Sequence, residues 1–357
     1  MALVFEHETK GQRVLFGSGR AAEHLGAEIA RLGSRTPLVI ASARHQKVIA
    51  DAGLAEALRY GQIVEHVPIE VADDARCVAM SNEADLVIAL GGGSATGLAK
   101  AVALTSGLPI VAVPTTFAGS EATDMWGLTE HGRKRTGIDS RVLPTTVIYD
   151  ATLLAALPVG LAAASGLNAV AHCVDSMWGP RADPINAALA MEGLRALRSG
   201  LPGVVSGESE ATELALYGCY LAAVAFASAG SGLHHKICHV LGGAFGLPHA
   251  ATHAVVLPHV LAFNAPNATA AVERIATALG DVDASDGLDR LRTSLHAPGA
   301  LREVGFQDDD VPAAAMLILA EVPPANPRPV DGAALTKLLH AAWSGSDPRL
   351  TWTERTA

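Results

Sequence analysis

The sequence has few aromatic residues, few charges and no excess of basic side chains. Of its 357 residues, 4% are aromatic and 17% are charged, and 36 acidic residues against 26 Lys and Arg leave a formal net charge of -10. Neutralising the phosphates of a nucleic acid requires clustered Lys and Arg. The composition therefore argues against a nucleic-acid partner, and the acidic surface chiefly serves solubility.

Cysteine is also scarce, and its positions form no CxxC pair. The four cysteines are widely separated: Cys77, Cys173, Cys219 and Cys238. This spacing predicts reduced thiols in a cytosolic protein rather than a disulfide framework. Residues 1–12 become polar and charged within a few residues of the start, so they provide neither the apolar core of a signal peptide nor an anchor. We therefore expect a cytoplasmic protein that does not associate with membranes.

One stretch, Leu214 to Leu233, lacks charge over about the length that a bilayer requires. It is rich in Ala, Gly and Ser, is interrupted by Gly230 and Gly232, and leads directly into several histidines. These features favour a buried helix of an all-helical domain over a membrane span.

Apolar residues make up half of the chain, and its length is sufficient for two domains with cores of their own. Up to about Asp150, short apolar runs alternate with segments of helical spacing, a pattern typical of βαβ units and a parallel sheet. The expected strands are Pro37–Ala41, Asp85–Leu90, Leu108–Val113 and Thr146–Tyr149, and the expected helices include Arg20–Leu32 and Ser94–Leu104.

After Asp150 the strand-like runs disappear, and Ala/Leu-rich stretches with helical spacing continue to about Gly345. The segment from Ser346 is expected to be a frayed end. We therefore predict an α/β nucleotide-binding domain over residues 1–152 and an all-α, substrate-binding domain over residues 153–357.

A glycine-rich turn follows the second apolar run: Gly91, Gly92, Gly93 and Ser94. Glycine allows the backbone to approach a pyrophosphate, and the free N–H groups of the following helix stabilise its charge. Ser94 is expected to be both the N-cap and a donor. An ordinary βα turn would also explain the glycines, since neither GxGxxG nor a Walker A lysine is present.

Two further loops strengthen the prediction of a nucleotide site. Thr115 and Thr116 follow another apolar run, at the carboxyl end of a predicted parallel strand where ligands of open α/β sheets bind. The first run ends at Ser42, where an acidic residue would normally hold a ribose 2′-hydroxyl. Because no carboxylate is there to repel a 2′-phosphate, we expect NADPH to be accepted alongside NADH.

Histidines recur at helical spacing in the second half. Asn168 and His172 are four residues apart and therefore share one helix face, as do His235 with His239 and His249 with His253. Converging imidazoles can hold a divalent metal such as iron or zinc, or can act as acids and hydrogen-bond donors. A lone histidine is more often an ordinary core or surface residue, but repeated pairs make that interpretation less attractive.

Several of these motifs together resemble iron-type alcohol dehydrogenases in order and spacing, over nearly the whole chain. The matching segments are Gly91-Gly92-Gly93-Ser94, Pro114-Thr115-Thr116, Asn168 with His172, and His235-Lys236-Ile237-Cys238-His239 through Pro248-His249. The resemblance implies a dehydroquinate-synthase-like fold of two domains, usually dimeric. In that family one Asp and three His bind the metal, and the matching positions here are Asn168, His172, His235 and His249, with His239 as a further histidine near the substrate.

Two residues depart from the family pattern. Asn168 stands in place of the Asp, and Gly97 stands where most members carry an Asp after the glycine loop. Both departures look like the maleylacetate reductase branch, as do the segments Ala95–Lys100, Phe117–Glu121, Arg141–Pro144 and Asn326–Val330. That resemblance implies a homodimer that uses NADH and/or NADPH to reduce the conjugated double bond of maleylacetate, giving 3-oxoadipate in the degradation of aromatic compounds.

An amide binds a divalent cation far less well than a carboxylate does. We therefore expect no tightly bound metal; a bound ion would be held by His172, His235 and His249. The imidazoles are expected to meet the nicotinamide ring at the crevice between the domains and to stabilise an enolate oxygen, with His239 or water returning a proton. The residues expected to take part are Asn168, His172, His235, Lys236, His239 and His249.

The substrate is a dicarboxylate, so cationic partners are expected. Lys236 is the first candidate; the basic run Arg133–Arg135 is equally well explained as a solvated loop. Two other functions remain open. One is a metal-dependent alcohol dehydrogenase or carbonyl reductase of the same fold, and the other is a non-catalytic nucleotide-binding protein.

Overall fold

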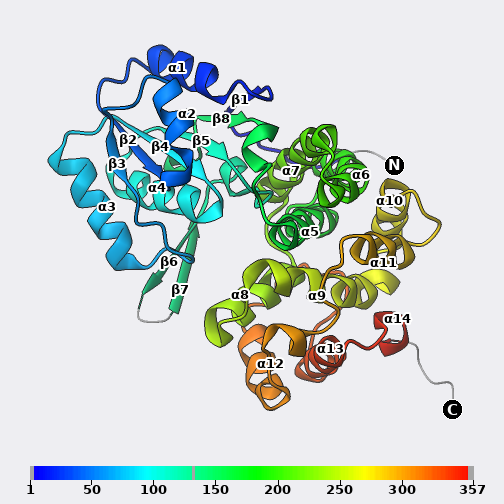
Figure 1. The fold of residues 1–357 in the computed structure, drawn as a ribbon. Coiled ribbons are helices and arrows are strands. Elements are labelled where there is room, and N and C mark those ends of the chain that lie inside the picture. Colours follow the sequence, from blue (N-terminus) through cyan, green and yellow to red (C-terminus); the bar gives the residue numbers. More distant parts are fainter. Residues whose placement is uncertain (1–3, 131–132, 353–357) are drawn as a thin grey trace, which may run out of the picture. The chain divides into compact units, whose positions relative to one another are not determined.

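The computed structural model describes residues 4–130 and 133–352, which form two compact units (Figure 1). One unit spans Thr9–Leu157. The other begins at Pro158 and also includes the described residues before Thr9. The first is an α/β unit and the second is helical throughout its described part, as predicted.

The α/β unit is built on a six-stranded sheet in the order β1-β8-β5-β4-β2-β3, in which all neighbouring strands are parallel. In that order the strands are Arg13–Phe16, Thr146–Tyr149, Ile110–Pro114, Leu86–Gly91, Pro37–Ala41 and Leu58–Tyr60. The parallel sheet confirms the prediction. Two predicted strands, β2 and β8, have the expected bounds, and β4 and β5 differ from theirs by one or two residues.

Helices cover both faces of this sheet. Helices α1 (Ala21–Leu32) and α2 (Gln46–Asp51) pack on one face, and α3 (Ile69–Ser81) and α4 (Gly93–Ser106) pack on the other. All six residues of β4 are buried. A strand covered on both sides must be apolar along its whole length, which is why the central strands could be recognised in the sequence.

A two-stranded antiparallel hairpin was not expected. It consists of β6 (Met125–Glu130) and β7 (Arg133–Ile138), so the basic run that begins at Arg133 belongs to a strand rather than to a loop. Arg135 is exposed and pairs with Glu130 at 3.0 Å; the side chains of the two preceding residues lie outside the described part. Short 3-10 helices complete this unit: η1 (Ala43–His45), η2 (Ser120–Ala122), η3 (Ser140–Val142) and η4 (Ala151–Leu154).

The helical unit begins with five long helices: α5 (Val159–Ser176), α6 (Pro184–Ser206), α7 (Ser209–Ala229), α8 (Leu233–Phe245) and α9 (His249–Asn264). It continues with η5 (Ala265–Asn267), α10 (Thr269–Leu279), α11 (Ala284–Ser294), η6 (Leu301–Val304), η7 (Asp308–Asp310), α12 (Val311–Leu319), α13 (Gly332–Ser344) and α14 (Pro348–Thr351).

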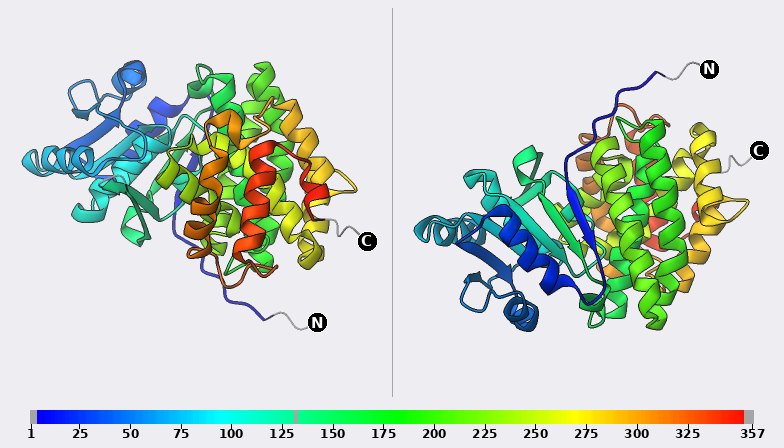
Figure 2. Two further views of the ribbon diagram at one scale, coloured as in Figure 1. Left: turned by 90° about the horizontal axis from the view of Figure 1, so that it is seen from below. Right: turned by 90° about the horizontal axis from the view of Figure 1, so that it is seen from above.

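Glycines allow α6 and α7 to lie directly side by side (Figure 2). A Cβ added at Gly200 would lie 2.8 Å from the carbonyl oxygen of Ala211, and one at Gly218 would lie 2.8 Å from that of Gly193. The backbones are therefore too close for side chains at these positions. By length and composition α7 could cross a membrane, but half of its most apolar window is buried within the protein, in keeping with the predicted core helix.

The prediction of a frayed end from Ser346 was wrong for residues 346–352, and the rest of that segment, residues 353–357, lies outside the described residues. Asp347 caps α14 by accepting a hydrogen bond from the N–H of Arg349. The ring of Trp352 packs edge-on against Phe263, and the guanidinium of Arg328 lies within 5 Å of both rings. Aromatic and cation–π contacts thus order the described part of this segment.

Candidate active site

The carboxyl ends of three adjacent strands bring the predicted cofactor residues together. Ala41 of β2 lies opposite Leu90 of β4, and Gly91 lies opposite Pro114 of β5. The N–H of Thr115 donates to the carbonyl oxygen of Gly91 at 3.0 Å. Ser42, the glycine turn and the two threonines therefore share one edge of the sheet, where ligands of open α/β sheets bind.

The glycine turn leaves no room for side chains. A Cβ at Gly91 would lie 2.9 Å from Cβ of Ala95, and a Cβ at Gly92 would lie 2.8 Å from Cγ2 of Thr116. The N-cap of α4 is Gly92, without a side-chain cap, so the prediction that Ser94 is the N-cap was wrong; Ser94 lies in the first turn. The first N–H groups of a helix lack intrahelical acceptors and can bind an anion.

Two buried hydroxyl groups at this edge have no hydrogen-bond partner among the described residues: Ser42 Oγ and Thr115 Oγ1. A buried polar atom left unsatisfied costs about 1–3 kcal/mol. A ribose hydroxyl or a phosphate oxygen would satisfy both groups. Together with the glycine turn, these atoms fit the phosphate and ribose groups of a dinucleotide.

In the helical unit, the histidines of α5 and α8 meet in a buried cluster. The rings of His172 and His235 are stacked, with centroids 4.9 Å and planes 16° apart. Phe226 of α7 contacts both rings, at 4.5 Å and 4.2 Å between centroids. Asn168 is also buried and lies one turn before His172 on α5.

The cluster continues from α8 to α9. The ring of His239 lies 6.2 Å from that of His235 and 6.3 Å from that of His249, centroid to centroid. The structure therefore brings together all four histidines that the sequence placed at the site. His239 and His249 are half-buried, whereas His172 and His235 are buried.

Sequence analysis did not assign His234 and His253 to the site. Both are fully buried, and His234 Nε2 lies 2.9 Å from His253 Nδ1. The ring of His253 is also 4.4 Å from that of His249 and 4.8 Å from that of His235. The helical spacing from His249 to His253 was visible in the sequence, but nothing there showed that His234 joins the same cluster.

Burial keeps these imidazoles uncharged. It lowers the pKa of His172 and of His234 to about 3, and it holds the pKa values of His235 and His253 well below the usual value, with smaller contributions from neighbouring histidines. A neutral imidazole offers one N–H donor and one lone pair. At neutral pH these four imidazoles can therefore donate hydrogen bonds or bind a cation without first losing protons.

The nitrogen donors fit a divalent cation. Ring nitrogens of His234, His235 and His253 all lie within 4.8 Å of one another. His172 Nδ1, His235 Nε2 and His253 Nε2 are buried without a hydrogen-bond partner among the described residues. Neutral imidazole suits iron and zinc, but the amide of Asn168 contributes no negative charge. The set would therefore hold a cation less firmly than one completed by a carboxylate.

Lys236 follows His235 on α8 but is partly exposed. Its ammonium lies 3.3 Å from the carboxylate of Glu321, and 31% of its side chain is accessible to solvent. Lys236, the predicted carboxylate-binding residue, is therefore next to His235 in the sequence, but its ammonium pairs with an acidic residue at the surface.

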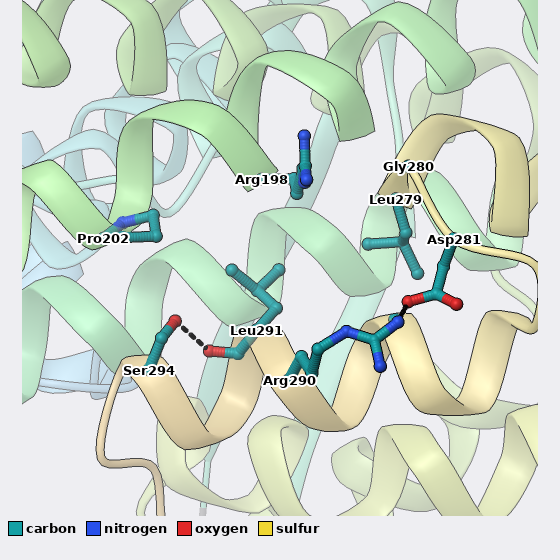
Figure 3. A pocket seen from close by; sticks show the side chains of 9 residues that line it. Arg198, Pro202, Leu279, Gly280, Asp281, Arg290, Leu291 and Ser294 are labelled. Carbon is teal, nitrogen blue, oxygen red and sulfur yellow. Dashed lines mark hydrogen bonds and ion pairs between the residues drawn. The ribbon is translucent and has the colours of Figure 1, made fainter.

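A separate pocket of about 250 Å³ lies at the side of the helical unit, between α6, α10 and α11 (Figure 3). Arg198 and Pro202 line it from α6, and Arg290 lines it from α11 and pairs with Asp281. It contains none of the histidines and none of the residues predicted for the site, so it is not the candidate active site.

A glycine-lined cradle at the edge of a parallel sheet, together with a buried histidine cluster in a helical unit, is the arrangement expected of a nucleotide-dependent oxidoreductase. The family model of the iron-containing alcohol dehydrogenases matches residues 11–151, and the model of the C-terminal part of the same family matches residues 162–343. The chain therefore belongs to the iron-containing alcohol dehydrogenase family.

Relatives and solved structures cover almost the whole chain. A maleylacetate reductase of Burkholderia cepacia is 43% identical over 96% of this chain and 99% of the relative. The structure of an iron-containing alcohol dehydrogenase from Corynebacterium glutamicum is 54% identical, with a TM-score of 0.95 over 98% of this chain and 100% of its own. That of a maleylacetate reductase from Agrobacterium tumefaciens is 38% identical, with a TM-score of 0.91 over 97% and 100%.

Proposed function

We propose that the protein reduces the conjugated C=C bond of maleylacetate to give 3-oxoadipate, with NADH or NADPH as the hydride donor. The observation that carries this proposal is the buried cluster of uncharged imidazoles beside Asn168, an amide at the position of the family's charged ligand. Near-full-length similarity to maleylacetate reductases supports the choice of substrate.

The reaction needs a hydride, a stabilised oxygen and a proton. The hydride leaves C4 of the nicotinamide and adds to the carbon β to the ketone of the substrate, so the cofactor is oxidised and the C=C electron pair moves into an enolate. A proton then adds to the α carbon, and the ketone is restored. Preorganised donors that face the enolate oxygen in a dry site supply the largest stabilisation, about 3–4 kcal/mol for one donor.

The buried imidazoles of His172 and His235 are suited to these tasks in their neutral form. We assign donation to the enolate oxygen, or to a substrate carboxylate, to His172, His235 and His249. His239 is half-buried and therefore fits the delivery of the proton, directly or through water. Lys236 is the proposed cationic partner of a substrate carboxylate, and a dianion would have to replace Glu321 as its partner.

The proposed cofactor site is Ser42, Gly91, Gly92, Gly93, Ser94, Thr115 and Thr116. The unsatisfied hydroxyls of Ser42 and Thr115 and the tight glycine turn support it. Because Ser42 has no carboxylate, the same site accommodates the additional phosphate of NADPH.

A second candidate function is the metal-dependent reduction of a carbonyl group. Two observations favour this function. The similar structure from Corynebacterium glutamicum is named an iron-containing alcohol dehydrogenase, and the histidine cluster offers nitrogen donors for a cation. A cation held by His172, His235 and His249 would polarise a carbonyl oxygen when bound. The neutral amide of Asn168 favours the first function, in which the imidazoles themselves act and no tightly bound metal is required.

Further parts of the proposal concern the protein as a whole. We assign nucleotide binding to the α/β unit, Thr9–Leu157, rather than to residues 1–152, and substrate binding to the helical unit from Pro158, rather than from residue 153, and we infer a cytoplasmic homodimer. The four scattered cysteines form no disulfide in the described structure, which is consistent with a reducing compartment. Sedimentation of the purified protein tests the dimer.

A steady-state assay separates the two candidate functions. NADH and NADPH are each supplied with maleylacetate, and separately with simple aldehydes, and the oxidation of the cofactor is followed by absorbance. The proposal predicts turnover of maleylacetate with both cofactors and identification of 3-oxoadipate as the product. Turnover of aldehydes alone would support the second function, and no turnover of either substrate would reject both.

A further inference from the structure

Asp175 is a fully buried carboxylate that sequence analysis did not single out. It lies on α5, close to one turn after His172, and none of its surface is accessible. An isolated buried carboxylate is costly unless hydrogen bonds compensate for the lost water. The partners of Asp175 therefore indicate what the residue does.

Most of the groups facing Asp175 can only donate. The backbone N–H groups of Gly232, His234 and His235 bind its carboxylate, and the indole N–H of Trp178 lies 3.4 Å from Oδ1. Oδ2 accepts from the N–H of His235 at 3.2 Å and lies 2.7 Å from Nδ1 of the same residue. A carboxylate surrounded by donors in this way is an acceptor toward the imidazole as well.

Two of these donors, the N–H groups of His234 and His235, belong to the first turn of α8, and a third is the N–H of Gly232 just before it. The N-cap of this helix is Gly232, which has no side chain to satisfy the first N–H groups. Asp175 supplies that cap from a different helix. Burial raises the pKa of Asp175 to about 7, its hydrogen bonds oppose that rise, and the ionised form also complements the helix dipole. The cap requires glycine at position 232, because a Cβ there would collide with the carboxylate of Asp175.

The same carboxylate determines the tautomer of His235. An imidazole that donates through Nδ1 carries its lone pair on Nε2, as is usual where a carboxylate orients a functional histidine. His235 Nε2 is buried and has no hydrogen-bond partner among the described residues. The ring of His235 is stacked on His172 and lies edge-on to His253.

We propose that Asp175 is a positioning residue that caps α8 from α5 and fixes His235 as the Nδ1–H tautomer, with the lone pair of Nε2 presented to the histidine cluster. In this form Nε2 accepts a proton or binds a cation, so of the three histidines assigned to donation His235 donates to the enolate oxygen only after a proton has been relayed to Nε2. The proposal refines the site of the proposed function, but its structural part does not depend on which substrate is reduced.

The first test reads the tautomer in the wild-type protein. Histidine is labelled with 15N, and the signals of His235 are assigned from their absence in the His235→Gln spectrum. The proposal predicts a protonated Nδ1 and a bare Nε2 at neutral pH. A protonated Nε2 with a bare Nδ1 would overturn it, and this result requires neither an active enzyme nor a variant of Asp175.

The second test replaces Asp175 by Asn. The amide oxygen can still accept from the backbone of α8, but the NH2 group donates to Nδ1, so the proton of His235 moves to Nε2. We expect the opposite tautomer in the spectrum and a fall in kcat of about tenfold or more, with the KM for NADH unchanged. An unchanged tautomer and unchanged kcat would contradict the proposal.

Asp283→Asn is the matched control. Asp283 caps α11 by accepting from the N–H groups of Ser285 and Asp286, and it forms no hydrogen bond or ion pair with a histidine among the described residues. This variant makes the same carboxylate-to-amide change at a helix cap in the same unit and likewise keeps an acceptor oxygen, so kcat should be unchanged. If both variants lost the same activity, Asp175 would be a cap only. If the wild-type protein did not reduce maleylacetate at all, the proposed function would fail while the spectra still decided the tautomer.

Discussion

The rings of His172 and His235 are stacked at 4.9 Å although they belong to different helices, α5 and α8. Each of these residues was recognised from its spacing to another polar residue on its own helix. Their contact shows that the face of α5 that carries His172 packs against the face of α8 that carries His235. It also explains why both imidazoles are neutral, since burial lowers the pKa of His172 to about 3 and that of His235 well below its usual value.

Removing an imidazole from this cluster should abolish most of the catalysis. We expect His235→Ala and His249→Ala each to lower kcat about 100-fold or more, because each removes a group that faces the developing charge or its proton. Steady-state kinetics with maleylacetate measures this effect. His340→Ala, an exposed histidine of α13 paired with Asp308, is the control and should keep wild-type activity. Near-full activity of both cluster variants would show that the site is misplaced.

Cofactor preference should depend on Ser42. We expect the wild-type protein to use NADPH as well as NADH, and Ser42→Asp to raise the KM for NADPH about tenfold or more because a carboxylate repels the 2′-phosphate. Ser81→Asp adds the same charge at an exposed position at the end of α3 and should alter neither KM. Inactivity of the wild-type protein with millimolar NADPH would refute this prediction.

Lys100 should be a major contributor to the stability of the α/β unit. Its ammonium is buried and donates to the carbonyl oxygens of Ser120, Thr123 and Met125 at 2.6–2.8 Å. Lys100→Met keeps the volume but leaves these acceptors unsatisfied, which should lower the free energy of unfolding by about 3 kcal/mol or more. Urea unfolding measures the change.

The control for this loss is Lys47→Met. Lys47 is exposed and pairs with Asp51 on α2, and such surface pairs contribute about 0.5 kcal/mol. Equal losses for the two lysine variants would show that the buried ammonium has no special role.

Acid should destabilise the protein partly through His259. Burial, with a smaller effect of Arg292, lowers the pKa of His259 to about 4 in the folded chain, against an ordinary value of 6.5. Between these two values the unfolded chain binds more protons, so stability falls as pH falls through this window. From pH 7 to pH 5 the loss from this residue is about 2 kcal/mol.

His259→Leu removes the titrating group while keeping an apolar side chain inside α9. Between pH 7 and pH 5 the wild-type protein should therefore lose about 2 kcal/mol more of its unfolding free energy than the variant does. Identical pH dependence in the two proteins would contradict the assignment of a buried neutral imidazole.

The sequence predicts correctly those elements for which one local pattern is sufficient. Strands such as β4 are buried on both faces and so are apolar throughout, and the pairs formed by His235 with His239 and by His249 with His253 follow from helical spacing alone. It missed β1, β3 and the hairpin of β6 and β7. These strands are short or partly exposed, so their composition does not differ from that of loops.

The site residues that the sequence did not predict were missed for a different reason. His234 joins the cluster only because His253, from another helix, reaches its ring nitrogen. Asp175 acts on α8 from α5. Contacts between helices depend on the packing of the whole unit, and no spacing along the chain encodes them. The start of α4 at Gly93 rather than at Ser94 is an error of one residue, within the usual uncertainty of helix ends.

The central claim is that uncharged imidazoles, without a firmly bound metal, support reduction of a conjugated double bond. The most direct measurement is the rate of maleylacetate reduction by protein treated with EDTA and shown by elemental analysis to contain no iron or zinc. We predict that the metal-free protein retains its kcat and forms 3-oxoadipate in equal amount to the NADH consumed. Complete loss of activity, restored by Fe²⁺ or Zn²⁺, would contradict this claim and favour the metal-dependent reaction.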